Sequence, residues 1–149
     1  MNRPIKFRGI SPIEPPSNWW YYGNLITEPM HISGTIENGG VKTFIRPDDG
    51  NPNGAMFEVK PETVGQFTGL LDKNGKEIYE GDIVVETYAR ISGRIETHCL
   101  FVKWDDYGAR WSQTDDIAGS GFGTSTSLTK NGEYEVIGNI YESPTLLTP

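Results

Sequence analysis

The stretch QFTGLLDKNGKEIYEGDIV, residues 66–84, constrains the fold more than any other part of the chain. Phe67–Leu71 is short and apolar, and Asn74-Gly75 follows it with two residues that tolerate the positive φ of a tight two-residue hairpin turn. Glu80-Gly81-Asp82 favours a second break, because Gly and Asp prefer turns to strand pairing. Ile83–Val85 is β-branched and begins another strand. The pattern predicts strand, turn, strand, loop and strand.

The rest of the chain repeats this pattern of short apolar or alternating runs between turn residues. Its 18 Gly and 10 Pro favour turns over long helices. Residues 94–104 form the longest run and become apolar on both faces, which is typical of a central strand. Residues 41–45 are expected to pair with 31–37 in a hairpin, and 113–127 to form a mobile loop. The expected strands are 5–9, 19–26, 31–37, 41–45, 56–59, 67–71, 77–79, 83–88, 94–104, 109–112 and 134–140, with single helical turns at 61–64 and 143–147.

These elements predict an all-β fold. The length of 149 residues fits a single domain over 1–149. Residues 66–149 suit a small, bent, SH3-like barrel. Residues 1–65 would add N-terminal strands, which divides the domain into two sub-lobes.

Three blocks of the sequence resemble the YopX family of phage and prophage proteins. They lie at residues 5–8, 66–84 and 136–147, in the order that the family has. The resemblance implies a phage or prophage origin and a small, mostly β fold. It implies no catalytic residue, because none is established for the family.

The net charge of −7 is concentrated in the second half of the chain. Residues 1–65 hold 7 acids and 6 bases, whereas residues 66–149 hold 13 acids and 7 bases. Such a surface repels a phosphate backbone, whose binding depends on Lys and Arg. It suits solubility, basic protein partners or imitation of nucleic acid.

The compartment is predicted from cysteine usage and hydropathy. Cys99 is the single cysteine, so no intramolecular disulfide can form, as fits a reducing cytosol. No signal-peptide core follows Met1, and no apolar run approaches the roughly 20 residues of a membrane helix. We expect a protein of the bacterial host's cytoplasm with no membrane contact.

Two acidic motifs suggest chemistry at first sight. Residues 49–54, DGNPNG, match the start of a calcium loop, but the twelfth position is Lys60 instead of a bidentate Glu. An exposed Asx-rich turn is the better interpretation. Glu80 and Asp82 flank a glycine without a neighbouring His, so we expect Asp82 to cap nearby amides and not to act in catalysis.

Histidine and cysteine give no recognisable site. His31, His98 and Cys99 lack the spacing of a metal site, and no local signature supports a catalytic pair of His31 with Cys99. Cys99 is expected to be a small core residue. The sequence therefore predicts no catalytic residue, no metal site, no cofactor and no enzymatic activity.

The aromatic run at residues 19–22 is the strongest candidate for function. In a strand its side chains alternate between two faces, so half of them lack an obvious core. Exposed Trp and Tyr are enriched at interfaces. The alternative is that the fold covers both faces. The candidate partner surface is Trp19, Trp20, Tyr21, Tyr22, Trp104 and Trp111.

Three functions remain open from the sequence. The leading one is an accessory protein that binds a host or phage protein, or another copy of itself, with inhibition of host defence as one route. The second is a nucleic-acid-binding barrel, which the net charge disfavours. The third is a small-molecule binder or enzyme with an aromatic pocket. The second would use Lys6, Arg8, Arg90, Arg94, Lys103, Arg110 and the tryptophans.

Overall fold

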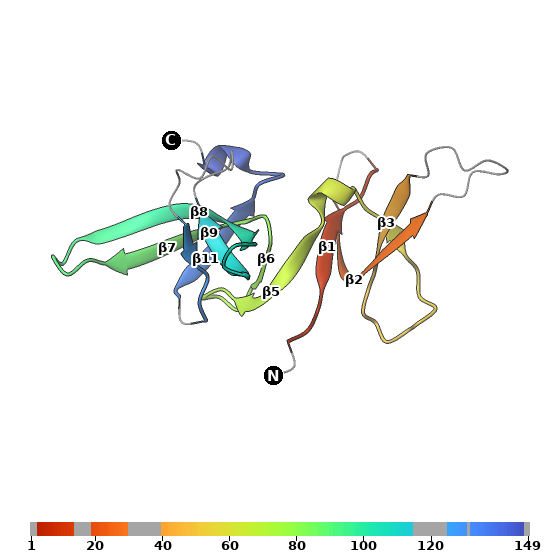
Figure 1. The fold of residues 1–149 in the computed structure, drawn as a ribbon, viewed down its shortest axis with the longest axis horizontal. Coiled ribbons are helices and arrows are strands. Elements are labelled where there is room, and N and C mark those ends of the chain that lie inside the picture. Colours follow the sequence, from red (N-terminus) through yellow and green to blue (C-terminus); the bar gives the residue numbers. More distant parts are fainter. Residues whose placement is uncertain (1–2, 14–18, 30–39, 115–124, 131, 148–149) are drawn as a thin grey trace. The chain divides into compact units, whose positions relative to one another are not determined.

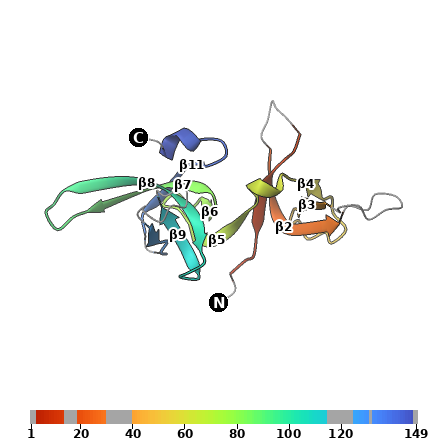
Figure 2. The ribbon, with the colours of Figure 1, turned by 45° about the horizontal axis from the view of Figure 1, so that its top comes forward.

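The computed structural model confirms the all-β prediction (Figures 1 and 2). It describes all residues except 1–2, 14–18, 30–39, 115–124, 131 and 148–149. The described elements are antiparallel strands and two 3₁₀ turns. The chain divides into two compact units, Met1–Gln66 and Phe67–Pro149, which are described one at a time.

The first unit is an antiparallel sheet in the order β4-β3-β2-β1, with the start of β5 beside β1. Strand β3 pairs with β2, for example through Thr43 and Thr27. The sequence predicted that residues 41–45 pair with 31–37, which lie outside those described; the described partner of residues 41–46 is β2. The elements are β1 Phe7–Ile10, β2 Trp20–Pro29, β3 Val41–Arg46, β4 Phe57–Glu58, η1 Pro61–Thr63 and β5 Gly65–Leu71.

Close packing around β1 fixes this unit. A Cβ on Gly9 would lie 2.8 Å from the Cβ of Val59, so the site admits only glycine. Ile10 accepts a hydrogen bond from the Lys60 N–H (2.8 Å) and donates one to Thr63 Oγ1 (2.9 Å). The predicted helical turn at 61–64 is confirmed as η1, which closes the end of β1.

The second unit contains a five-stranded sheet in the order β10-β9-β8-β7-β11. The long strand β8 is central, as predicted. The sheet is open and not a closed barrel, because among the described residues the edge strands β10 and β11 pair only with β9 and β7. The elements are β6 Glu77–Tyr79, β7 Asp82–Ala89, β8 Ile95–Asp105, β9 Arg110–Thr114, β10 Ser125–Ser127, β11 Tyr134–Asn139 and η2 Pro144–Leu147.

The predicted loop over 113–127 needs correction at both ends. Gln113 and Thr114 complete β9, and Ser125–Ser127 form β10. Both segments are held by pairing of Thr114 with Ser125 and of Ser112 with Ser127. Residues 115–124 lie outside those described.

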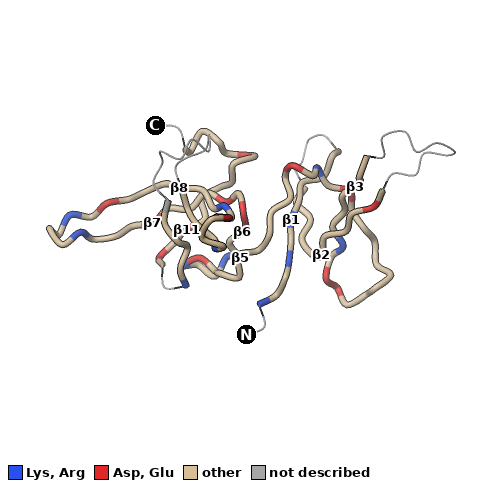
Figure 3. Tube along the Cα trace, viewed as in Figure 1, with Lys and Arg blue, Asp and Glu red and all other residues tan. Residues whose placement is uncertain are grey.

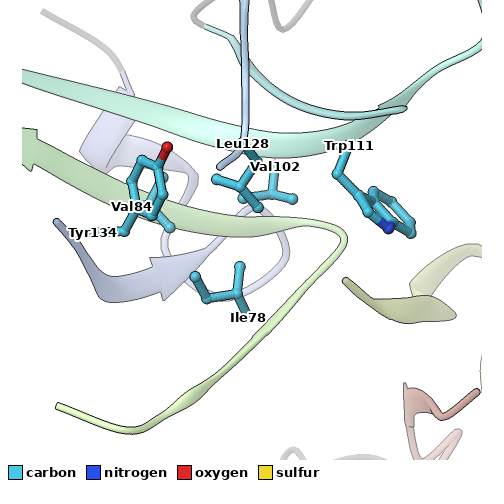
Figure 4. Close-up of a cluster of buried hydrophobic side chains, with 6 residues drawn as sticks. All are labelled: Ile78, Val84, Val102, Trp111, Leu128 and Tyr134. Carbon is cyan, nitrogen blue, oxygen red and sulfur yellow. The ribbon is translucent and has the colours of Figure 1, made fainter. Parts of the chain in front are cut away.

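The core of the second unit is built by apolar side chains from several strands (Figure 4). Leu128, which follows β10, enters this core, and its N–H bonds the Trp111 carbonyl (3.0 Å). Tyr134 is buried, and its hydroxyl accepts a bond from the Thr129 N–H (3.1 Å). The core residues are Ile78, Val84, Val102, Trp111, Leu128 and Tyr134.

The β5–β6 turn differs from the predicted two-residue type. Gly75 has a positive φ of 83°, but Asn74 does not. The Gly75 N–H bonds the Asp72 carbonyl (3.0 Å), and the Asp72 N–H bonds the Lys76 carbonyl (2.7 Å). This is a three-residue loop with glycine in the left-handed position. The Asp72 side chain selects it by accepting bonds from the N–H groups of Asn74 (2.8 Å) and Lys76 (2.9 Å).

Asp72 also ties this turn to the C-terminal strand β11. Its Oδ2 accepts a hydrogen bond from the Val136 N–H (3.1 Å), and the Lys73 N–H bonds the Tyr134 carbonyl (2.8 Å). Burial raises the pKa of the Asp72 carboxyl, but three backbone N–H bonds and the charge of Lys76 lower it by more. At neutral pH the carboxylate is therefore ionised, and both of its oxygens accept hydrogen bonds from the backbone.

The second predicted break, at residues 80–82, also has a structural cause. Gly81 has a φ of 84°, donates its N–H to the Val102 carbonyl (2.8 Å) and accepts from the Ile140 N–H (2.9 Å). Asp82 is buried and accepts a bond from the Tyr79 N–H (2.8 Å), as predicted for an amide cap. These bonds hold the β6–β7 corner against β8 and the C-terminal segment.

Replacing Asp72 by Ala should lower the free energy of unfolding by about 3 kcal/mol, because three backbone donors lose their acceptor. Asp72→Asn should cost less, since one amide oxygen remains. Urea denaturation at neutral pH measures both. Asp106→Ala, at an exposed position, is the control and should change little. An Asp72→Ala protein as stable as wild type would contradict the assigned role.

The contribution of Asp72 should depend on pH. Its folded pKa lies below its ordinary value of 3.8, so its stabilisation is complete above that value and disappears as pH falls through the folded pKa. The stability difference between wild type and Asp72→Asn should therefore shrink in acid. Denaturation curves of both proteins from pH 7 downwards test this, and a difference that grows in acid would refute it.

Candidate functional site

The aromatic run in the first unit is partly packed and partly exposed. The Arg8 guanidinium lies over the Trp20 ring, 4.4 Å from its centroid. Tyr21 stacks on Phe57 with centroids 4.3 Å apart and planes 8° apart. Trp19 is 58% exposed. Neighbours thus cover the middle of the run on both faces of β2, while Trp19 and Tyr22 present apolar surface at its ends.

The two tryptophans of the second unit have different roles. Trp104 and Trp111 face each other across β8 and β9 and pack edge to face, with centroids 5.0 Å apart. Trp104 keeps an exposed face, whereas Trp111 is 7% exposed and belongs to the core. Trp111 therefore does not belong to the candidate partner surface, because its ring is buried in the core of the second unit.

The most unusual surface of the second unit is a long hairpin. Among the residues that the structure describes, strand β11 pairs with β7 only up to Glu86, and β9 pairs with β8 only from Phe101 onwards. Strands β7 and β8 nevertheless stay paired with each other as far as Ala89 and Ile95. We call residues 87–100 the hairpin arm. It is a two-stranded ribbon that extends past the rest of its sheet (Figure 1).

The arm carries apolar side chains that nothing described covers. Ile91 in its turn is fully exposed, and Ile95 is 70% exposed. Tyr88 packs against the His98 ring, with centroids 5.3 Å apart. An isolated two-stranded ribbon is marginally stable in water, and exposed apolar side chains add to its tendency to associate. These features are typical of a contact surface.

The charges on the arm are arranged in a local network. Arg90 Nε lies 2.7 Å from Glu96 Oε2, and this hydrogen bond raises the pKa of Arg90 and lowers the pKa of Glu96. The Tyr88 hydroxyl donates to the same carboxylate (3.2 Å) and lies 3.1 Å from His98 Nε2. Figure 3 shows basic residues at the tip, where Arg90 and Arg94 lie. The tip is thus basic and apolar on an acidic unit.

The expected strands at 83–88 and 94–104 left a short connection between them, but the sequence did not identify the arm. The signal was a length mismatch: β7 and β8 have 8 and 11 residues, whereas their outer neighbours β11 and β9 have 6 and 5. The number of residues that pair in each strand cannot be counted from one sequence, because it depends on the neighbouring strands. Two isoleucines flanking a basic turn would have been the accessible hint.

Three of the six cations named for nucleic-acid binding contact other side chains of the chain. Arg8 is buried under Trp20, Arg90 pairs with Glu96, and Arg110 Nε lies 3.4 Å from Asp105 Oδ2. A groove that tracks phosphates needs cations that point to solvent. Arg8 therefore contributes little to such a groove, whereas the side chains of Arg90 and Arg110 stay more than half exposed beside their acidic partners.

The residues considered for metal or small-molecule chemistry take structural roles. In the 49–54 segment the Asn51 N–H bonds Asp49 Oδ1 (2.9 Å) and the Asn53 N–H bonds Asn51 Oδ1 (3.0 Å), as expected of an Asx-rich turn. An open hollow of about 270 Å³ lies beside it. Its lining is Asn24, Arg46, Pro47, Asp48, Gly50, Asn51 and Pro52. Among the described residues, no three His, Cys, Asp or Glu side chains gather to hold a metal.

Cys99 is a half-buried thiol and not an activated nucleophile. Its Sγ donates to the Leu146 carbonyl (3.3 Å), and burial raises its pKa. A thiol needs a lowered pKa to react readily at neutral pH. His31, the other member of the conceivable pair, lies outside the described residues. Within the part of the chain that the structure describes, no helix is long and apolar enough to cross a bilayer.

The two kinds of tryptophan should respond differently to truncation. Trp111→Ala should lower the free energy of unfolding by about 3 to 5 kcal/mol, because it empties a core position. Trp19→Ala, at the exposed end of the aromatic run, should change it by less than about 0.5 kcal/mol. Urea denaturation measures both. A large loss with Trp19→Ala would show that this ring is packed and unavailable to a partner.

Comparison with known proteins places the chain in a family. The family model described as YopX protein matches residues 18–148. A crystal structure of protein EF1440 from Enterococcus faecalis is similar, with 23% identity, a TM-score of 0.45, and coverage of 98% of this chain and 99% of that one. No curated protein matches the chain. Since the family model spans most of its length, the chain belongs to the YopX protein family.

Proposed function

We propose that the protein acts by binding another protein chain, with the hairpin arm as its principal contact surface. The observation that carries this proposal is the exposure of Ile91 and Ile95 on a ribbon whose outer edges are unpaired among the described residues. Leaving such apolar area in water costs free energy that burial against a partner would recover. Unpaired strand edges also offer main-chain donors and acceptors to a second chain.

Charge favours a protein partner over nucleic acid. Residues 66–149 carry 13 acids against 7 bases, which disfavours a phosphate backbone over most of this unit's surface. A basic and apolar tip suits a partner surface that is acidic at its rim and apolar at its centre. Trp19 and Tyr22 offer a second, smaller contact surface on the first unit.

The proposed setting follows from family membership. A YopX family chain is expected to come from a phage or prophage and to work in the cytoplasm of the bacterial host. Its partner is then a host protein, a phage protein or a second copy of the chain, and interference with host defence is one route of action. Cys99, the single cysteine, is a free thiol that donates a hydrogen bond to the Leu146 carbonyl, which fits a reducing compartment.

The double substitution Ile91→Ser with Ile95→Ser should abolish partner capture without unfolding the protein. Both side chains are exposed, so stability should change by no more than about 0.5 kcal/mol each. The tagged wild type and the variant are used as baits in host lysate and with a differently tagged copy of the chain. Captured proteins are compared by mass spectrometry.

The matched control is Ile137→Ser, because Ile137 is an exposed isoleucine on β11, away from the arm. It should capture the same proteins as the wild type. Equal capture by wild type and by the arm variant would reject the arm as the contact surface.

A further inference from the structure

The two ends of strand β8 carry opposite charges. Residues 90–95, which we call the arm tip, hold two arginines and no acid. Residues 104–108 lead through the turn from β8 to β9; we call them the far turn, and they hold two aspartates and no base. Strand β8 has 11 residues, so these two ends lie about 33 Å apart.

One of the two arginines at the arm tip has no partner. The turn is closed by bonds from the Gly93 N–H to the Arg90 carbonyl and from the Arg90 N–H to the Arg94 carbonyl, both 2.8 Å. The Arg90 side chain pairs with Glu96. Arg94 is exposed, and its side chain makes no hydrogen bond or ion pair with the described residues. Arg94 is therefore the charge that the arm tip offers to another molecule.

The far turn repeats this arrangement with the opposite sign. Asp105 Oδ1 accepts a hydrogen bond from the Gly108 N–H (3.2 Å), and Asp105 Oδ2 lies 3.4 Å from Arg110 Nε. Asp106 is exposed, and within the described part of the chain its side chain has no hydrogen bond or ion pair. Both ends are thus ordered turns that hold one unpaired charge in water, and ordered surfaces lose less entropy on binding.

The same two turns carry the most exposed apolar side chains. Among the described large apolar residues, Ile91 at the arm tip and Tyr107 in the far turn are the two that are fully exposed. Ile95 and Trp104 add partly exposed apolar surface beside them. Burial of this area against another apolar surface is favourable. Each end therefore combines an apolar centre with one free charge.

We propose that the arm tip of one copy of the chain binds the far turn of a second copy, so that copies associate head to tail. This inference rests on the proposed function and names the partner as a second copy. The contact brings Ile91 against Tyr107 and Arg94 against Asp106, which matches apolar area and charge at once. Because β8 holds its two ends apart, a single chain cannot make this contact with itself.

A head-to-tail contact has a distinct signature in solution. Each added copy leaves one arm tip and one far turn unused, so association continues beyond a dimer as concentration rises. Two turns bury a small area, which predicts weak association. The exposed charges predict that salt weakens it further.

Charge reversal tests the pairing of Arg94 with Asp106. Arg94→Asp gives both ends of a chain an unpaired acid, and Asp106→Arg gives both ends an unpaired arginine. Each variant alone should raise the dissociation constant about tenfold or more. In an equimolar mixture every acidic end meets a basic end, so association should return. Sedimentation velocity over a concentration series at low ionic strength measures this.

The matched control is Lys130→Asp, which makes the same charge change at an exposed position outside both ends. It should associate as the wild type does. A folding defect cannot be repaired by mixing, so restored association in the mixture of the two charge variants separates a contact from a loss of structure.

Apolar substitutions test the direction of the contact. Ile91→Ser disables the arm tip and Tyr107→Ser disables the far turn, so each variant alone should be monomeric. Their mixture retains one productive contact, between the intact far turn of one variant and the intact arm tip of the other. It should therefore stop at a dimer, whereas the wild type forms larger species.

Several results would overturn the inference. They are a wild type that is monomeric at every concentration, a charge-variant mixture as weak as its components, and wild-type association by Tyr107→Ser or Ile91→Ser alone, which would mean a symmetric contact. The proposed function is judged separately. If a monomeric chain captures a different protein through Ile91 and Ile95, binding through the arm stands and only self-association fails.

Discussion

The carboxylate of Asp72 is the interaction on which the second unit depends. It fixes the β5–β6 turn through the N–H groups of Asn74 and Lys76, and it holds β11 through the N–H of Val136. Two parts of the chain that are 64 residues apart in sequence thereby share one acceptor. Buried backbone donors must find partners, so the choice of aspartate here dictates both the turn type and the docking of the C-terminal strand.

Other residues in the blocks that resemble the YopX family, at 66–84 and 136–147, also hold the second unit together. Gly81 joins β8 to the C-terminal segment through its N–H and C=O groups, and Asn139 accepts the N–H groups of Tyr141 and Glu142 before η2. These hydrogen bonds hold the β6–β7 corner and the segment before η2 in place. The surface that we assign to binding lies instead on the arm, where β7 and β8 extend past the strands that cover them.

The sequence predicted element types well where local chemistry decides them. The turn residues around Asp72 and Gly81, the long central strand and the two helical turns are all recognisable from residue type and spacing. It failed where a competing partner decides. Val41–Arg46 pairs with β2. Asn74 has no positive φ, because the Asp72 side chain stabilises a three-residue loop in place of the two-residue turn. Trp111 enters the core although its sequence neighbours are polar.

The sequence by itself determined an all-β protein of the YopX family without a recognisable catalytic constellation, because turn chemistry, strand alternation and family blocks are local properties. Only the tertiary structure decided that the second sheet stays open, that Trp111 is covered and Trp19 is not, and that β7 and β8 extend as an arm. The physical reason is that pairing and burial depend on residues far apart in the chain. The exposure of Ile91 cannot be predicted until the neighbouring strands have been placed.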